Sequence, residues 1–247
     1  MPSVAADVPA DSSILCEGCG YTLDGLPPGA NCPECGKPTV ESTSGDGRHS
    51  PAWEAAGGLG PARSARFGRT TWQAIVHPSR FFRGLTARDP LAPARRFAMI
   101  HWFFASGLFT AAARAHWMWI MGNAGQADAM PRIIVTAGLV AVTFLALWGT
   151  TELAAVLTAW EARYRGLRLP KSTVLRGLYY HAAHYLPVAF LALLTTGGHA
   201  ILVPNDAGWR DSVYSYLIVL STGIILAAVY LFWTYWAAMR NMMYANR

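Results

Sequence analysis

Long apolar blocks in the C-terminal two-thirds of the chain constrain its fold more than any other feature. From Val213 to Met239 there is no Asp, Glu, Lys, Arg or His. An apolar stretch of 18 or more residues is long enough to cross the hydrocarbon core of a membrane as a helix. The whole sequence is 53% hydrophobic and only 14% charged, whereas a soluble domain has about 25% charged residues. This composition weighs against a disordered chain, a coiled coil and an ordinary water-soluble enzyme.

The apolar blocks begin after Arg95 and Arg96, and residues 95–247 are predicted to form a transmembrane helical domain. The expected membrane helices are about Phe97–Met121, Ile133–Trp160, Leu178–Val203 and Val213–Met239. The predicted fold class is an all-α polytopic membrane bundle of four helices, or five, with a small β-rich zinc ribbon at the N-terminus. Small residues, as in the pairs Gly107 with Ala111 and Gly223 with Ala227, favour close approach of helices or a homo-oligomer.

The distribution of Lys and Arg predicts which side of the membrane each end occupies. From Arg63 onward, fifteen lie before the first helix, between the second and third, or after the fourth, and only Arg132 and Arg210 lie in the other two loops. Because cytoplasmic loops carry the excess of positive charge, both termini are expected in the cytosol. The N-terminus has no secretory signal pattern. We therefore expect an integral membrane protein.

Four cysteines near the N-terminus form two C-x-x-C pairs separated by twelve residues. They are Cys16, Cys19, Cys32 and Cys35, and the chain contains no other cysteine. Two such pairs predict a tetrahedral site with four thiolate ligands for a structural zinc ion, because four thiolates leave no coordination position for water. Gly20 and Gly36 follow the second cysteine of each pair, where a positive φ is expected. Two disulfides in an exported domain are the alternative.

Residues 14–40 are assigned to this ribbon, and residues 1–13 to a disordered tail. Many zinc ribbons bind nucleic acid, but this one has three acidic residues and the single base Lys37. That balance is a poor match for phosphates, so nucleic acid is not expected as a partner. An unidentified cytosolic protein is the expected partner.

Residues 41–69 are rich in Ser, Gly, Ala and Arg and are predicted to be a flexible linker. Residues 70–94 mix aromatic and basic side chains and are predicted to lie at the membrane interface. An amphipathic helix that binds a protein partner is the alternative. The arginines expected to bind lipid headgroups are Arg80, Arg83, Arg88, Arg95 and Arg96.

Ionisable residues within the predicted helices raise a chemical hypothesis, because such groups are costly in hydrocarbon unless they are paired or solvated. His101, Glu152, His181 and His184 are expected at similar depth in the cytosolic half, where they could bind zinc or iron. Simple hydrogen bonds at the interface are the alternative.

The same histidines permit a second hypothesis, in which a b-type haem is held by two histidines. The candidate pairs are His101 with His184 and His116 with His199. A small transporter is a further alternative, with Pro187, Gly197 and Gly198 as the signs of an interrupted helix. No hydrolase or phosphate-binding motif occurs in the sequence.

The motifs also resemble known families. LCEGCGYTLDGLP followed by CPECG is similar to the zinc ribbon at the front of many bacterial membrane proteins. WQAIVHPSRFFRGL, with Pro78, Phe81 and Phe82, and TVLRGLYYHAAHYLPVAFLALL resemble the bacterial branch of the Yip membrane family. Eukaryotic members of that family interact with small GTPases in vesicle traffic and commonly have five membrane helices. The residues and this resemblance together predict a non-enzymatic integral protein of the bacterial inner membrane that acts in interaction or membrane organisation.

Overall fold

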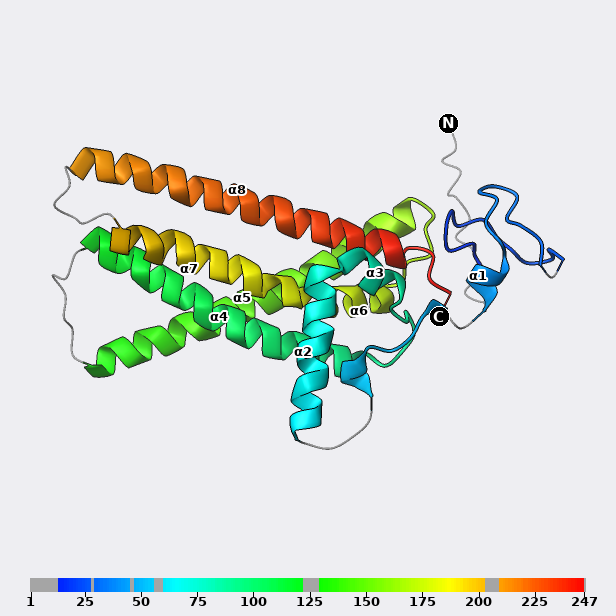
Figure 1. Ribbon diagram of the computed structural model, residues 1–247, viewed down its shortest axis with the longest axis horizontal. Helices are drawn as coiled ribbons and strands as arrows, with labels where there is room; N and C mark the ends of the chain where they lie inside the picture. The colour runs from blue at the N-terminus through cyan, green and yellow to red at the C-terminus, as the bar shows by residue number, and fades with distance from the viewer. Residues whose placement is uncertain are drawn as a thin grey trace. The chain divides into compact units, whose positions relative to one another are not determined.

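The structure is a computed structural model, and it describes residues 13–27, 29–44, 47–55, 60–121, 129–202 and 209–246. These residues form helices and contain no β-strand. In chain order the helices are α1 (Val40–Thr43), η2 (Ala52–Glu54), α2 (Pro61–Val76), α3 (Pro78–Arg83), α4 (Leu91–Met121), α5 (Ala129–Tyr164), α6 (Lys171–His181), η3 (Ala182–His184), α7 (Tyr185–Leu202) and α8 (Trp209–Met242) (Figure 1).

Three helical segments of the described chain are long and apolar enough to cross a membrane. They are Arg132–Tyr164, Lys171–Leu202 and Val213–Met242. The first and third contain the predicted helices Ile133–Trp160 and Val213–Met239. The second contains the predicted Leu178–Val203 except Val203, which lies outside the described residues. The remaining prediction, Phe97–Met121, lies in α4, which has 31 residues but does not reach the same apolar composition. Arg114 and the histidines of α4 reduce its hydropathy.

The second of these segments is interrupted, as Pro187 led us to expect. The chain is α-helical in α6, takes the tighter 3₁₀ form in η3, and returns to α-helix in α7. Proline lacks a backbone N–H, and its ring clashes with the carbonyl four residues earlier, which here belongs to Ala183. The 3₁₀ turn therefore lies where the proline prevents a regular α-helix.

The chain divides into two compact units. The first unit contains residues 1–97, 151–181 and 234–247, and the second contains residues 98–150 and 182–233. In the first unit, Trp53 packs on Phe67 and Phe97, and the ring of Phe97 packs on Tyr180. These aromatic contacts fix η2 and α2 within the unit. Helix α2 begins at Pro61, so the last nine residues of the predicted linker are helical.

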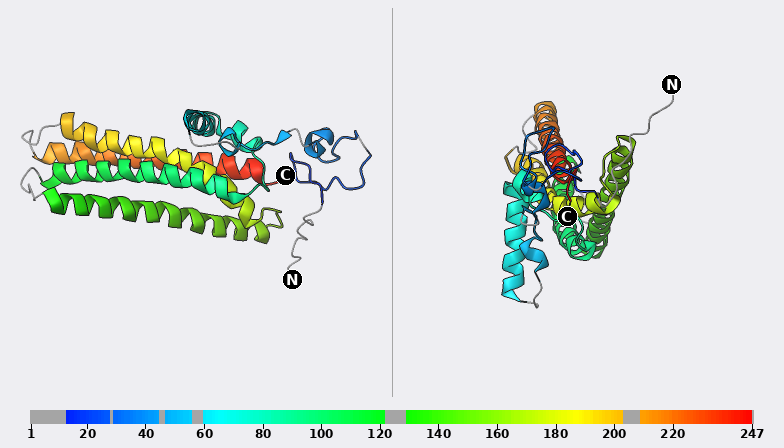
Figure 2. Two further views of the ribbon diagram at one scale, coloured as in Figure 1. Left: turned by 90° about the horizontal axis from the view of Figure 1, so that it is seen from below. Right: turned by 90° about the vertical axis from the view of Figure 1, so that its right-hand side faces the viewer.

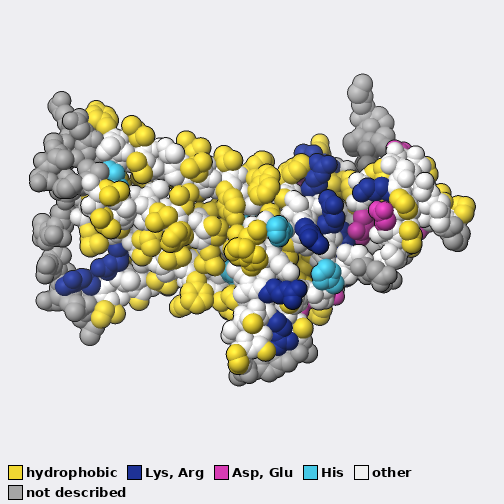
Figure 3. Space-filling view, in the orientation of Figure 1, with side chains coloured by type: hydrophobic (Ala, Val, Ile, Leu, Met, Phe, Trp, Pro, Cys, Tyr) yellow, Lys and Arg dark blue, Asp and Glu magenta, His cyan; other side chains and the backbone are white. Residues whose placement is uncertain are grey.

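In the second unit, α7 and α8 run side by side (Figures 1 and 2). They approach closely at Gly223, where a Cβ atom would lie 2.9 Å from Cγ2 of Thr195. This confirms the expectation that Gly223 allows two helices to pack. Gly107 has no such neighbour within 4 Å. Hydrophobic side chains cover the visible surface of the long helices (Figure 3).

Candidate metal centre

The two cysteine knuckles are copies of one structure, displaced by sixteen residues. In the first, Cys16 N donates to Tyr21 O at 2.8 Å, and in the second Cys32 N donates to Lys37 O at 2.7 Å. Isolated antiparallel bridges join Leu15 to Thr22 and Asn31 to Pro38. These bridges are the only sheet-like pairing within the described part of the ribbon, so the expected β-rich structure is reduced to single bridges.

Glycine closes each knuckle, as expected from the sequence. Gly20 N donates to Cys16 O at 2.8 Å, and Gly36 N donates to Cys32 O at 2.9 Å. The φ angles of these glycines are 84° and 72°, in the left-handed region that residues with a Cβ rarely adopt. The turns thus bring both sulfurs of each pair to one face.

The four cysteine sulfurs lie within 4.8 Å of one another. Cys16 Sγ is 3.5 Å from Cys35 Sγ, and Cys19 Sγ is 3.5 Å from Cys32 Sγ. Four thiolates bound tetrahedrally at 2.3 Å from a zinc ion would be separated by about 3.8 Å. A disulfide would instead require about 2.05 Å, and all four cysteines are free. The set can therefore hold a metal ion, and the disulfide alternative does not fit.

The environment of the thiols differs between the pairs. Burial raises the pKa of Cys19 to about 12, and the nearby cysteine thiols act in the same direction. Burial also acts to raise the pKa of Cys32, but the backbone N–H groups of Cys35 and Glu34 outweigh it and lower that pKa to about 7. A cation bound here must displace protons from several thiols, which makes its affinity dependent on pH.

The ribbon makes direct contacts with the C-terminal end of the chain, within the first unit. Asn246 is the principal residue: its side-chain Oδ1 accepts from Leu15 N at 2.9 Å, and its Nδ2 donates to Leu15 O at 2.7 Å and to Ser42 O at 3.1 Å. Its backbone N donates to Glu17 Oε1 at 3.2 Å. The Tyr244 ring covers Gly20, where a Cβ atom would lie 2.5 Å from that ring.

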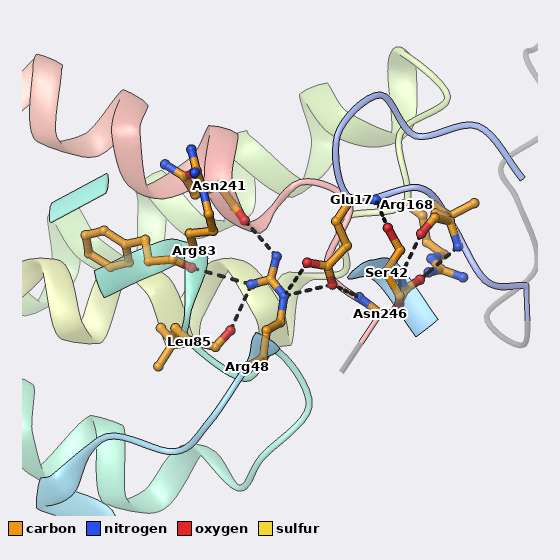
Figure 4. Close-up of polar contacts among 10 residues, drawn as sticks. Glu17, Ser42, Arg48, Arg83, Leu85, Arg168, Asn241 and Asn246 are labelled. Atoms are coloured by element: carbon orange, nitrogen blue, oxygen red, sulfur yellow. Dashed lines mark hydrogen bonds and ion pairs between the residues drawn. The ribbon is translucent and has the colours of Figure 1, made fainter. Parts of the chain in front are cut away.

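Arg48 extends this contact to α8 and to the turn after α3 (Figure 4). Its Nε lies 2.9 Å from Glu17 Oε1, and its side chain is 5% exposed. Its guanidinium also donates to Leu85 O at 2.9 Å and Asn241 O at 3.0 Å. Arg168 donates to Ser13 O and to Asn246 Oδ1. The ribbon is therefore attached to the rest of the first unit through two buried arginines, Arg48 and Arg168, and the partly buried Asn246.

The intramembrane residues of the metal hypothesis each have a hydroxyl or other partner. In the first unit, Tyr179 donates to Glu152 at 2.9 Å, and His181 Nε2 lies 2.9 Å from Thr234 Oγ1. In the second unit, His184 Nδ1 lies 2.8 Å from the hydroxyl of Tyr230, and His101 is fully buried. Among the residues described, the cysteines form the only group of three or more metal-ligating side chains.

His116 and His199 of the haem hypothesis both contact Tyr216 in the second unit. The Tyr216 hydroxyl is hydrogen-bonded to Nδ1 of His116. The centroid of the Tyr216 ring lies 4.9 Å from the centroid of the His199 ring. Bis-histidine haem ligation needs both imidazoles to face one iron. Because Tyr216 contacts both imidazole rings, the geometry does not support a haem iron held by His116 and His199.

The five arginines assigned to lipid are all exposed. They are Arg80, Arg83, Arg88, Arg95 and Arg96. Among them, Arg83 Nε donates to Asn241 Oδ1 at 3.3 Å. Basic side chains gather over the region of α2 and α3 (Figure 3). Trp72 on α2 is 65% exposed, so this surface combines an aromatic ring with cations.

Sequence reasoning missed three residues that hold the ribbon: Asn246, Arg48 and Arg168. Arg48 lies in the predicted linker, and Arg168 was counted only as a topological charge. Asn246 is one polar residue in a polar tail. No local pattern distinguishes them, because their partners lie far away in the sequence.

A scan against protein-family models finds no match to this chain, and neither does a search of curated proteins or of solved structures.

Proposed function

We propose that this chain is a non-enzymatic integral membrane protein that presents a zinc-loaded ribbon in the cytosol. The observation that carries the proposal is the convergence of four cysteine sulfurs within 4.8 Å of one another on two matched knuckles. An all-thiolate set of this size favours zinc, and it leaves no open position for a reacting group. The metal would therefore act structurally.

The number of membrane crossings follows from a parity argument. Leu15 and Asn246 are hydrogen-bonded, so the ribbon and the C-terminal end lie on the same side of a bilayer. The chain must then cross the bilayer an even number of times between them. Three helices of the described chain are long and apolar enough to cross, so one further crossing is needed. Helix α4 is about 46 Å long, which exceeds the roughly 30 Å hydrocarbon core. This supports α4 as a fourth crossing, with both termini in the cytosol of a bacterial cell.

The second knuckle supports contact with a protein partner. Glu34, Cys35, Gly36 and Lys37 are exposed, and a Cβ atom at Gly36 would meet nothing within 4 Å. The first knuckle is instead covered by the chain's own Tyr244. The resemblance to Yip-type proteins, together with an exposed ribbon, favours a role in membrane organisation through protein interaction.

The basic surface of α2 and α3 supports contact with anionic lipid. Arg80 and Arg83 on α3 are exposed, as is Trp72 on α2, and indole rings favour the bilayer interface. Cationic side chains at this level attract anionic headgroups.

Metal analysis of the purified protein tests the proposal. We expect one zinc per chain, and no zinc when Cys32 and Cys35 are both replaced by serine. A haem absorption band, or metal that remains in that variant, would instead favour the redox alternative. Metal-free wild-type protein that keeps its ribbon folded would overturn the zinc assignment.

Crosslinking tests the interaction role. A photoreactive residue at Lys37 should capture a specific protein in intact cells, whereas the same residue with the cysteines replaced should not. The absence of any specific product from zinc-loaded protein would count against recruitment by the ribbon.

A further inference from the structure

The two knuckles share one backbone structure but differ in their surroundings. Gly20 of the first knuckle lies under the Tyr244 ring, and Gly36 of the second has open space at the same position. The difference arises because the chain's own C-terminal segment, residues 243–246, covers only the first knuckle. This segment follows the end of α8 directly.

The contact is specific because one side chain pairs with both backbone groups of Leu15. The Asn246 amide accepts from Leu15 N and donates to Leu15 O, as a neighbouring strand would. Glu17 adds an acceptor for the backbone N–H of Asn246 and an ion pair with Arg48. A segment that merely lay against the ribbon would not make three matched hydrogen bonds in this way.

The surface that receives the segment depends on the metal centre. Leu15 and Glu17 flank Cys16, whose backbone N–H and carbonyl make the knuckle hydrogen bonds with Tyr21 and Gly20. The buried hydrophobic cluster of the ribbon consists of Cys16, Leu23 and Cys32, with Cys19 and Leu26 packed against it. Three of these five residues are ligands, so little apolar surface would hold the ribbon together without a bound ion.

We propose that metal binding by the ribbon and attachment of the C-terminal end of α8 are coupled, so that the ribbon is a metal-dependent latch on the membrane domain. The inference rests on the proposed zinc site and adds a consequence for α8. With metal bound, the first knuckle holds residues 243–246. Without it, Asn246 and Tyr244 lose their partners on the ribbon, and the segment after α8 is released. Since the coupling is reciprocal, the segment also strengthens metal binding.

Photocrosslinking in the full-length protein tests the latch. Tyr244→p-benzoylphenylalanine should form a crosslink to residues 14–24 in zinc-loaded protein, identified by mass spectrometry. A zinc chelator with a reductant should abolish that product, and added zinc should restore it. The same substitution at the exposed Trp72 provides a control that should give no ribbon crosslink.

Matched acidic residues in the two knuckles test the reciprocal effect. Glu17 contacts the C-terminal segment, and Glu34 is exposed on the second knuckle. Glu17→Ala and Asn246→Ala should lose zinc to a chelator about tenfold more readily, the effect expected from losing one or two hydrogen bonds. Glu34→Ala should behave like the wild type.

The outcomes separate the latch from the zinc site. A crosslink that persists after zinc removal, or its absence from protein with one zinc per chain, would overturn the latch and leave the zinc site standing. Equal chelator sensitivity of the Glu17 and Glu34 variants would also overturn it. Protein that binds no zinc at all would overturn both.

Discussion

Arg176 has a side chain with no exposed surface, yet it carries a full charge. Its Nη2 lies 2.8 Å from Glu54 Oε1 and 3.3 Å from Asp89 Oδ2. Its Nε donates to the backbone oxygen of Thr86 at 2.6 Å. A buried charge is tolerated only when it is paired and hydrogen-bonded in this way. The cluster joins η2, the segment before α4, and α6 within the first unit.

Arg176→Met should destabilise the first unit by about 3–5 kcal/mol, because it leaves Glu54 buried without its counter-ion. Thermal unfolding in detergent would measure the loss. Arg165→Met is the matched control: Arg165 and Glu161 form a pair whose side chains are 65% and 54% exposed, and such pairs contribute about 0–1 kcal/mol. Equal effects of the two substitutions would contradict the proposed role of burial.

Asp89 should make the free energy of unfolding depend on pH under acidic conditions. Burial acts to raise its pKa, but hydrogen bonds from Ser50 and Thr86 and the charge of Arg176 lower it below the ordinary value. The folded protein then binds fewer protons than the unfolded chain, so stability rises with pH in this range. The stabilisation is complete above the unfolded pKa of about 3.9 and is lost as pH falls through the folded pKa.

The melting temperatures of wild type and Asp89→Asn measure this contribution. The difference between them should be constant from about pH 5 to 7 and should narrow below about pH 4. A difference that widens in acid would show that the pKa of Asp89 shifts in the opposite direction.

At the scale of elements, the two knuckles separate the effect of backbone strain from the effect of the contact with Tyr244. Gly20 and Gly36 both have positive φ, so alanine is strained at each. Only at Gly20 would the added Cβ also collide with Tyr244. Gly20→Ala should therefore weaken the ribbon more than Gly36→Ala, measured as zinc retention against a chelator. Equal zinc loss from the two variants would mean that backbone strain alone, and not the contact with Tyr244, determines zinc retention.

Helix packing in the second unit gives a similar comparison. Gly223→Ala should destabilise the contact between α7 and α8 by about 1–3 kcal/mol, because the Cβ would overlap Thr195. Gly107→Ala, which meets open space, should be neutral or slightly stabilising in a helix. Thermal unfolding of the two variants would measure the difference, and the reverse order would contradict this packing.

At the scale of the whole molecule, the contact between ribbon and C-terminal end makes a topological prediction. Green fluorescent protein should be fluorescent at either terminus, since it folds in the cytosol. Alkaline phosphatase is active only in the oxidising compartment across the membrane from the cytosol. It should therefore be active when fused after Met121 and inactive when fused after Tyr164. An inactive fusion after Met121 would mean that α4 does not cross the membrane.

Much of the architecture was predictable because its causes are local. Three apolar helices, the interruption before Pro187, the positive φ of Gly20 and Gly36, and the grouping of four cysteines all follow from residues close together in the sequence. The length and hydropathy of a segment are enough to predict a membrane helix. A short C-x-x-C turn is enough to predict a pair of thiolate ligands. The extent of α2 was not predicted, because Trp53 and Phe67 stabilise it through contacts across a segment rich in Gly, Ala and Arg.

The sequence by itself determined that this protein has apolar helices and a set of four cysteines, since each depends on neighbouring residues. Only the tertiary structure decided what those parts contact. Asn246 pairs with Leu15 across almost the full length of the chain, and Arg176 finds Glu54 and Asp89 on distant segments. Such pairings arise from the packing of the folded chain, which brings together groups that no local periodicity relates.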